Sequence, residues 1–365
     1  MIKKIAVLGA GHAGATLAAL LAIKGFEVRL YDHPKFKRNI EEIAERGGVE
    51  LIGVVEEFGK VSIATTDIKS VVPGADVVMF AVPSFVHSVF MEKALPYVED
   101  GQIVVVTTDN FGSLVFREMM RKKGVKRDIK IAGTSSQPFI ARLVTPAKAN
   151  LQRLKSVLPV AALPATDTPN VVKSLKEVLP AFVPAKSVLE LGFGNFNMIT
   201  HPPTVVLNAA RIEDTKGDFL LFRQGVTRAV SRVMEKMDEE RIKVAEKLGL
   251  EVMSTLDILR QVYSSEKRGE DLYDWITGAE VWSKGRGPAS LDHRYMTEDV
   301  PYTLVPISSF GKLTNTPTPV IDSIIVLSSI MLRTDYFKSG RGVEELGLSG
   351  MRSEQILKYV QEGTK

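Results

Sequence analysis

Near its N-terminus the chain reads Lys4-Ile-Ala-Val-Leu-Gly-Ala-Gly-His-Ala-Gly14, and this stretch decides the fold. The apolar run Lys4–Leu8 predicts a buried strand, and the composition of Ala13–Lys24 predicts a helix. Between them, residues 9–14 form a G-x-G-x-x-G pattern, which is a weak signal alone but a specific one between a strand and a helix. The stretch therefore predicts the strand–turn–helix that opens a doubly wound, dinucleotide-binding sheet.

Each position of this turn has a physical reason. Gly9 allows the tight turn, Gly11 lets the backbone approach a pyrophosphate, and Gly14 permits close packing of helix on strand. The helix start at His12 and Ala13 presents unpaired N–H groups and the positive end of the helix dipole to phosphates. We therefore predict that these five residues contact a dinucleotide.

An acidic residue, Asp32, closes a second predicted strand, Glu27–Tyr31. At this position a carboxylate accepts hydrogen bonds from the hydroxyls of the adenosine ribose, which favours NAD. The basic stretch 35–38 (Lys-Phe-Lys-Arg) follows closely and suits a 2′-phosphate instead, so NADP stays open as the alternative cofactor.

Strand and helix patterns continue to alternate through the first half of the chain. Further strands are predicted at Asp76–Ala81, Gln102–Thr107 and Ile129–Ala132, and helices at Ser84–Leu95 and Phe111–Lys123. Alternation at this spacing predicts a parallel, doubly wound α/β sheet of the Rossmann type.

Three residues follow the strand Asp76–Ala81 at the edge of the sheet where such folds bind their ligand. Val82, Pro83 and Ser84 are therefore predicted to contact the cofactor, and Ser84 also suits a helix cap. His87, one turn later, is expected to be a packing or surface residue.

The pattern loosens between Leu151 and Pro184, where prolines recur and a loosely wound tail is expected. Helical spacing dominates after that point, and Pro319–Leu332 is predicted to be a buried core helix. We predict a dinucleotide-binding domain over residues 1–185 and a mainly helical substrate and catalytic domain over residues 186–365. The predicted fold class is α/β plus all-α.

Composition narrows the chemistry. The 365 residues fit about two domains, and the absence of cysteine excludes disulfides, thiolate metal sites and a cysteine nucleophile. We expect no metal site. Only five histidines are present, so imidazole chemistry near neutral pH must come from His12, His33, His87, His201 or His293.

Charge and hydropathy patterns bear on partners and location. The chain has 47 basic and 43 acidic residues, a net charge of +4, and its basic runs are short and mixed with apolar residues. This pattern argues against a nucleic-acid partner. The N-terminal apolar run is too brief for a signal peptide, and Pro319–Leu332 falls short of the ~20 residues a membrane span needs. A soluble, cytoplasmic protein without a membrane partner is expected.

The most informative stretch of the second half surrounds His201. The double proline 202–203 suits the first turn of a helix, so a helix is predicted to start there with His201 at its entrance. Thr204, Asn208 and Arg211 then fall on the same face as His201. The alternative is a structural histidine beside two prolines.

A second constellation lies in the segment 291–302. Arg294 can grip a carboxylate with two hydrogen bonds, and Asp299 or Glu298 can orient an imidazole. Arg294 and Asp299 are five residues apart, so the segment must bend if both serve one site, and Pro301 makes a continuous helix there unfavourable. An exposed charged loop without a role is the alternative.

Three segments of the chain resemble a known family. H-P-P-x-x-x-L-N-A-x-R-I-E (201–213), H-R-Y-M-T-E-D-V-P-Y (293–302) and G-R-G-V-E-E-L-G-L (340–348) are similar to octopine/nopaline-type opine dehydrogenases. The resemblance runs over nearly the whole length. It implies NAD(P)H-dependent reductive condensation of an amino acid with a 2-oxo acid such as pyruvate, through an imine, and the reverse oxidation.

The resemblance also implies residue roles. His201 matches the catalytic histidine of the family, Asp299 its carboxylate partner, and Arg294 the arginine that holds a substrate carboxylate. Thr204 and Asn208 are expected to contact substrate. The chemistry agrees, because imine formation needs a group that gives and takes a proton near neutral pH.

The sequence leaves two other functions open. One is a related reductase of simple ketones, like ketopantoate reductase or glycerol-3-phosphate dehydrogenase, but such relatives rely on a lysine that the segment 107–111 lacks. Another is a nicotinamide-nucleotide sensor without turnover. The expected partners are an amino acid and a 2-oxo acid, and a homodimer is left open.

Overall fold

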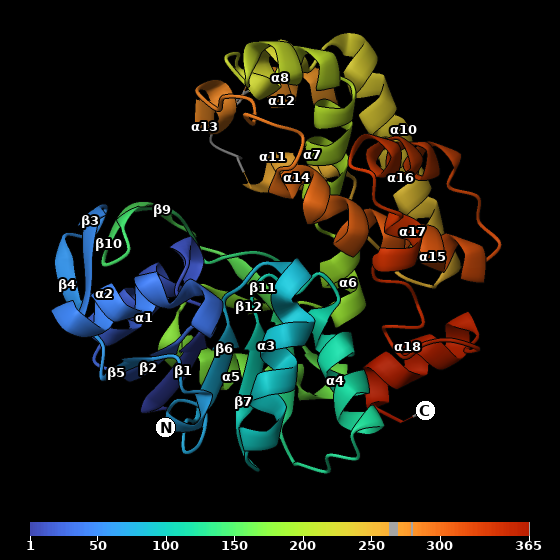
Figure 1. Ribbon diagram of the computed structural model, residues 1–365. Helices are drawn as coiled ribbons and strands as arrows, with labels where there is room; N and C mark the ends of the chain where they lie inside the picture. The colour runs from blue at the N-terminus through green and yellow to red at the C-terminus, as the bar shows by residue number, and fades with distance from the viewer. Residues whose placement is uncertain (263–268, 279, 365) are drawn as a thin grey trace. The chain divides into compact units, whose positions relative to one another are not determined.

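The computed structural model describes residues 1–262, 269–278 and 280–364, and Figure 1 shows their elements. The chain forms two compact units. Unit 1 comprises Met1–Gly192 and the C-terminal residues from Lys358 onward, and unit 2 comprises Phe193–Leu357. The predicted domain boundary, at 185, lies seven residues before this division, and the predicted second domain included the last residues, which cluster with unit 1.

Unit 1 is built on one eight-stranded sheet. In sheet order its strands are β12 (Phe182–Pro184), β11 (Leu158–Leu163), β8 (Lys130–Thr134), β7 (Ile103–Val106), β6 (Val77–Phe80), β1 (Lys4–Leu8), β2 (Glu27–Tyr31) and β5 (Ile63–Thr65). All neighbours are parallel except β8 and β11. The chain order reverses at β1, between β2 and β6, and this topological switch point is where doubly wound sheets bind ligands. The predicted parallel Rossmann sheet is confirmed.

The helices of unit 1 flank this sheet. They are α1 (His12–Ile23), α2 (Lys37–Arg46), α3 (His87–Ala94), α4 (Gly112–Lys122) and α5 (Thr168–Val178), and the divisions between the units fall inside α6 (Val188–Phe193) and α18 (Ser353–Glu362). Short helical turns are η1 (Pro34–Phe36), η2 (Ile68–Ser70), η3 (Ser84–Val86), η4 (Leu95–Tyr97) and η5 (Ala165–Asp167).

A second sheet, absent from the sequence prediction, covers the outer face of α1. Its strand order is β4 (Glu57–Lys60), β3 (Gly48–Gly53), β10 (Lys148–Leu154) and β9 (Phe139–Thr145). A Cβ added to Gly59 would lie 2.4 Å from the Cα of Ala19, so the strand backbone rests directly on the helix. Since α1 is covered on both faces, all residues from Gly14 to Leu21 are buried, which explains why this helix has no polar stripe.

The predicted loose tail over 151–184 is wrong. This segment forms the end of β10, then β11, α5 and β12. Two of its prolines stand where a missing N–H is tolerated: Pro169 lies in the first turn of α5, and Pro184 ends the edge strand β12.

Unit 2 is helical, as predicted. Its helices are α7 (Asn197–Val206), α8 (Ala209–Thr215), α9 (Leu221–Gly225), α10 (Arg228–Lys247), α11 (Thr255–Val262), α12 (Leu272–Gly278), α13 (Glu280–Ser283), α14 (Arg294–Thr297), the π-helical turn η6 (Val300–Leu304), α15 (Val305–Leu313), α16 (Pro319–Met331) and α17 (Tyr336–Ser339). The β-structure in its described residues is one isolated bridge, Leu220 to Arg286.

The helix α16 confirms the predicted element but not its complete burial. Ile321, Ile324 and Ile325 are buried, whereas Leu327 is 40% and Ile330 69% exposed. One face packs into unit 2 and the other presents apolar side chains to solvent. Across the described residues, no helix has the length and apolar run that crossing a bilayer requires.

Candidate functional site

The glycine turn of unit 1 has the geometry that its sequence predicts. Gly9 has φ +112°, and a Cβ there would lie 2.4 Å from Cγ1 of Val82. A Cβ on Gly14 would lie 1.7 Å from the carbonyl oxygen of Gly9. Packing therefore demands glycine at both positions, and Val82 is placed against the turn as part of its wall.

Gly11 differs from these two glycines, because an added Cβ would meet no heavy atom of the described protein within 4 Å. Internal packing does not require this glycine, whereas close approach of a pyrophosphate would. The helix α1 begins at the next residue, His12, and within its own residues has no acidic side chain in the first turn and no capping side chain. Its N–H groups are thus suited to phosphate, and this turn fits a dinucleotide.

Asp32 completes the turn from the end of β2. Its carboxylate is 5% exposed, and its oxygens accept hydrogen bonds from the N–H groups of Ala10 (3.0 Å) and His33 (2.7 Å). Burial raises the pKa of the Asp32 carboxyl, and the two N–H bonds oppose this change. The basic stretch 35–38 is exposed on η1 and the start of α2, so it stays available for a 2′-phosphate.

The residues after β6 are held from several sides. Ser84 is 2% exposed and its Oγ accepts a hydrogen bond from Nδ2 of Asn110 at 2.9 Å. Pro83, not Ser84, occupies the cap position of η3, so the predicted capping role of Ser84 is wrong. His87 is fully buried with Nε2 3.2 Å from the carbonyl oxygen of Val82, in agreement with the predicted packing role.

The His12 side chain has a role that the sequence did not indicate. Its Nδ1 accepts a hydrogen bond from the N–H of Leu143 at 2.8 Å. This bond links the glycine turn to strand β9 of the small sheet. The small sheet therefore contacts both α1 and the glycine turn.

The polar contacts made by the residues that follow β7 and β8 were also not predicted from the sequence. Gln137 donates from Nε2 to the carbonyl oxygen of Thr107 at 2.8 Å, and Lys155 donates from Nζ to Oγ of Ser136 at 2.7 Å. Burial, and then the charge of Arg153, lowers the pKa of Lys155 to about 8. The polar run Thr-Ser-Ser-Gln (134–137) could have indicated these contacts. It follows the carboxyl end of a predicted strand, where such folds bind their ligand.

We expect Lys155→Met to be more stable than the native protein at neutral pH and to lose this advantage as the pH rises. The pKa is about 8 in the folded chain against an ordinary 10.5, so holding the charge costs folding up to about 3 kcal/mol. This cost is fully present below the folded pKa and disappears as the pH approaches the unfolded one. The lost bond to Ser136 subtracts about 1 kcal/mol at every pH.

Denaturant unfolding between about pH 6 and pH 10 measures this difference. The exposed Lys173→Met variant is the control and should track the native protein throughout. An equal stability gain for Lys155→Met across the whole range would contradict the assigned pKa.

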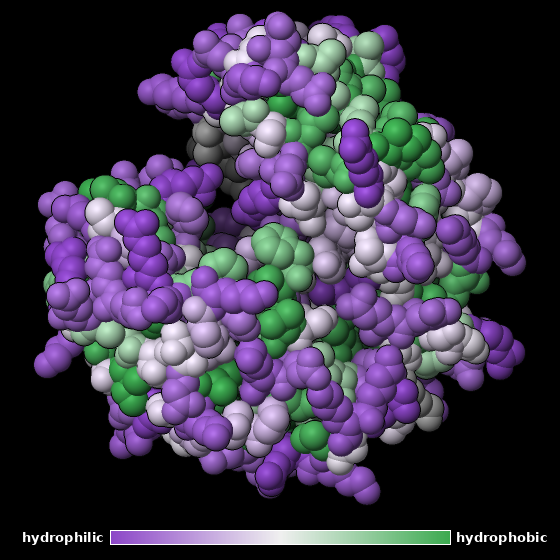
Figure 2. Space-filling model, viewed as in Figure 1, coloured by the Kyte–Doolittle hydropathy of each residue, from purple (hydrophilic) through white to green (hydrophobic). Residues whose placement is uncertain are grey.

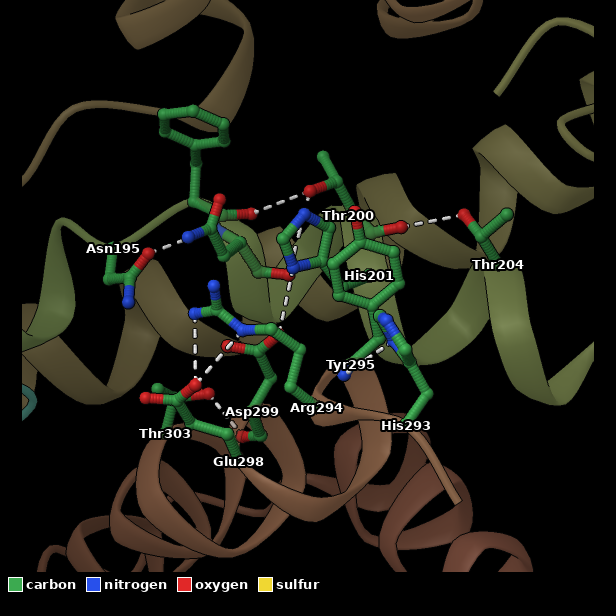
Figure 3. A network of polar contacts seen from close by, with 12 residues as sticks. Asn195, Thr200, His201, Thr204, His293, Arg294, Tyr295, Glu298, Asp299 and Thr303 are labelled. Atoms are coloured by element: carbon green, nitrogen blue, oxygen red, sulfur yellow. Dashed lines mark hydrogen bonds and ion pairs between the residues drawn. The ribbon is translucent and has the colours of Figure 1, made fainter. Parts of the chain in front are cut away.

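In unit 2 the structure joins two residues that are 98 positions apart. Nδ1 of His201 on α7 lies 2.8 Å from Oδ2 of Asp299, with side chains 15% and 2% exposed (Figure 3). A carboxylate only accepts hydrogen bonds, so Nδ1 carries the proton and Nε2 is the ring nitrogen left to exchange one with a substrate. The geometry is that of an imidazole whose tautomer is fixed by a buried acid.

The start of α7 differs from the prediction. The helix begins at Asn197, so the double proline 202–203 lies inside it and His201 lies one turn in. The Oδ1 of Asn195 accepts a hydrogen bond from the N–H of Asn197 at 3.1 Å and satisfies a donor at this end. Asn195 is the residue in the sequence that could have indicated this helix start. The double proline is the stronger signal for a first helical turn, so the predicted start lies too late in the chain.

The predicted bend between Arg294 and Asp299 is present. The helix α14 ends at Thr297 and the π-turn η6 follows at Val300. Glu298 pairs with Arg294, whose Nη2 and Nε lie 2.9 and 3.1 Å from the same Oε2. Asp299, rather than Glu298, therefore orients the imidazole, and the charge of Glu298 is the main cause of a raised pKa for Arg294.

Aromatic rings enclose the imidazole, which the sequence did not predict. The ring of Tyr295 stacks on His201 with centroids 3.8 Å apart and an interplanar angle of 28°, and Phe222 lies 6.0 Å away. The stacked Tyr295 ring covers one face of the imidazole and helps to hold its plane. His293 packs edge-on against Tyr295 at 4.6 Å and caps α14 with Nδ1.

Three other predicted residues have their donors engaged elsewhere. Thr204 is fully buried and donates to the carbonyl oxygen of Thr200 at 2.6 Å. Asn208 donates to the carbonyl oxygens of Thr204 and Gly225, and Arg211 is exposed, bonded to the main chain and placed over the ring of Phe219. For Thr204 and Asn208 these contacts favour structural roles over the predicted substrate contacts. In the described part of the chain, no three His, Asp or Glu side chains are grouped to hold a metal ion.

Comparison with known proteins finds a family match for each of the two units. Residues 184–332 match the family of NAD/NADP octopine/nopaline dehydrogenase, alpha-helical domain, and residues 4–128 match the NAD-dependent glycerol-3-phosphate dehydrogenase N-terminus. An opine dehydrogenase from Arthrobacter sp. (strain 1C) is 33% identical over 361 residues, which is 98% of this chain and 99% of that protein.

Solved structures show the same fold. Octopine dehydrogenase in complex with NADH and agmatine aligns over 100% of this chain and 98% of its own with a TM-score of 0.83 and 21% identity. The octopine dehydrogenase structure described with NADH and pyruvate gives a TM-score of 0.78 with the same coverage and identity.

Proposed function

The chain belongs to the opine dehydrogenase family, and from this premise we propose which of its residues carry the reaction and on which substrates. The enzyme is an NAD(P)-dependent oxidoreductase acting on CH–NH donors. It condenses an amino acid with a 2-oxo acid reductively, through an imine. We propose pyruvate as the oxo acid because octopine dehydrogenase has been solved with it. The observation that carries the assignment is the His201–Asp299 pair.

The residues of unit 1 suit the dinucleotide. The turn at Gly9, Gly11 and Gly14 would hold the pyrophosphate, and Asp32 the adenosine ribose. When bound, the nicotinamide supplies the hydride that reduces the imine carbon. Asp32 favours NAD, and the exposed basic stretch 35–38 is the feature that would accommodate NADP.

His201 and Asp299 supply the proton chemistry. Loss of water from the carbinolamine requires a proton on the departing hydroxyl, and Nε2–H of a protonated His201 can give it. In the oxidative direction, neutral Nε2 takes a proton from the amine or from water. The Asp299 carboxylate stabilises the imidazolium and holds its ring in one orientation through Nδ1.

Arg294 suits the substrate carboxylate. Its contacts with Glu298 use Nε and one side of Nη2, which leaves Nη1 and the other proton of Nη2 as a second edge. The side chain is 57% exposed, so this edge is open to a ligand. A carboxylate on this edge would be gripped by two parallel hydrogen bonds.

We expect Arg294→Met to raise the KM for the oxo acid by about 100-fold, the effect of losing hydrogen bonds to a charged group. Arg294→Lys keeps the charge without the planar fork and should recover part of the loss. Steady-state kinetics with varied pyruvate measure both. Arg286→Met, which removes an exposed arginine of unit 2, is the control, and an unchanged KM in Arg294→Met would remove this residue from the substrate site.

The proposed reaction is tested by incubating the protein with NADH, pyruvate and single amino acids while following absorbance loss. Oxidation that requires both the oxo acid and an amine is the expected result. Oxidation with the oxo acid alone would instead indicate a ketone reductase. Absence of oxidation with every pair would favour a nucleotide sensor.

Two narrower expectations complete the proposal. We propose a cytoplasmic location, which cell fractionation tests.

We also propose a homodimer, which light scattering of the purified protein tests. The support for the dimer is the apolar face of α16, where Val326, Leu327 and Ile330 are exposed. Figure 2 shows hydrophobic side chains gathered over this part of unit 2.

A further inference from the structure

The segment Gly340–Leu348, here called the C-terminal box, contains none of the residues assigned to the cofactor, the substrate or the catalytic pair. It lies against the elements that follow Asp299. The N–H of Arg341 donates to the carbonyl oxygen of Pro301 at 2.8 Å, and the N–H of Val343 donates to Oγ of Ser309 at 3.0 Å. The first of these bonds reaches the π-turn η6, and the second reaches α15.

The sequence of η6 leaves the carbonyl of Pro301 without a helical donor. The N–H of Val305 bonds to the carbonyl of Val300, five residues back, as in a π-turn. The next N–H in that pattern would belong to residue 306, which is a proline and has none. Arg341 supplies the missing donor from the C-terminal box, so the box completes the backbone bonding of the π-turn.

The Arg341 side chain adds a second link to the same turn. It is 0% exposed, its guanidinium lies 5.0 Å from the centroid of the Tyr302 ring, and its Nε is 3.8 Å from Oε1 of Glu345. Burying a guanidinium is costly unless its surroundings compensate. One of the compensating groups is the ring of Tyr302, the third residue after Asp299 and part of η6. The stability of the buried guanidinium therefore depends on the position of this turn.

We propose that the C-terminal box, through Arg341, fixes the π-turn and thereby aims the Asp299 carboxylate at Nδ1 of His201. Arg341 is then a positioning residue, and the inference rests on the catalytic pair of the proposed function. Asp299 is the residue from which η6 starts, and its carboxylate has one direction that meets the imidazole at 2.8 Å. A shift of the turn by a fraction of an ångström changes that direction.

Two glycines of the box provide a matched pair of variants. A Cβ on Gly340 would lie 2.8 Å from the carbonyl oxygen of Pro301 and 2.6 Å from that of Tyr336, so Gly340→Ala must press on the π-turn and on α17. A Cβ on Gly342 would have Oγ of Ser309 as its nearest neighbour, at an ordinary 3.5 Å. Gly342→Ala therefore changes the same loop without displacing the turn.

The readout is the proton on Nδ1 of His201, observed by NMR in histidine-labelled protein and assigned by its loss in His201→Ala. In the native protein and in Gly342→Ala it should give the low-field signal of a bond to a carboxylate. In Gly340→Ala and Arg341→Met the signal should move upfield or broaden. In these two variants kcat should fall about 10-fold, the effect of weakening one hydrogen bond to a charged group, with an unchanged KM for the oxo acid.

A native His201 signal in both Gly340→Ala and Arg341→Met would overturn the proposal and leave the box a purely structural element. Arg341→Lys should restore part of the native signal. If Arg341→Met does not fold, Gly340→Ala, which keeps the guanidinium, decides. The NMR signal does not depend on turnover, so the failure of the proposed reaction and the failure of this inference give different results.

Discussion

The His201→Ala variant is expected to lose turnover by about 10³-fold or more while binding NADH with native affinity. General acid–base catalysis by a positioned imidazole contributes 10² to 10⁴ in rate, and the variant also loses the charge that Asp299 stabilises. The residues assigned to the dinucleotide all lie in unit 1, whereas His201 lies in unit 2. Steady-state kcat with pyruvate and an amino acid, together with fluorescence titration of NADH, separates the two effects.

His293→Asn is the matched control for this result. His293 lies in the same aromatic cluster, 4.6 Å from Tyr295, and asparagine keeps the ability to cap α14. This variant should retain most of the activity. Full activity in His201→Ala would remove the imidazole from the reaction, and loss of NADH binding in it would show that the substitution acts beyond the proton chemistry.

The fold was predictable where its signal is local. The strand Lys4–Leu8, the glycine turn and Asp32 lie within the first 32 residues and together predict a strand–turn–helix followed by a second strand. The structure contains these elements. The small sheet was not predictable, because β3 pairs with β10 about 100 residues away and neither strand has the apolar run of a buried one. The prolines between 151 and 184 suggest breaks in the chain, yet Pro169 in a first helical turn and Pro184 at the end of an edge strand are compatible with regular structure.

For the site, the sequence indicated the residues but not their pairing. Spacing alone left Asp299 and Glu298 equally able to orient the imidazole, and the π-turn decides between them by a bend that periodicity does not encode. Helical periodicity also put Thr204 and Asn208 on the face of His201. It carries no information about what a donor bonds to, and both donors are taken by main-chain carbonyls.

Asp299→Asn is the second substitution with a large expected effect, a fall in kcat of about 100- to 1000-fold. The asparagine side chain has nearly the same shape, so the contact 2.8 Å from Nδ1 can persist. It has no charge, however, and the imidazolium that forms during proton transfer loses its stabilising partner. Its amide can also donate to Nδ1, which would place the ring proton on Nε2 and fix the wrong tautomer.

The exposed Asp292→Asn variant is the control, since it removes a carboxylate from the same segment without touching the pair. Asp299→Glu restores the charge but moves it by one methylene, and it should regain only part of the rate. Native kcat in Asp299→Asn would mean that the buried charge is not used. Because the carboxylate is 2% exposed, a thermal-unfolding measurement must accompany the kinetics, and a rate loss in a protein of native stability is the result that assigns Asp299 to catalysis.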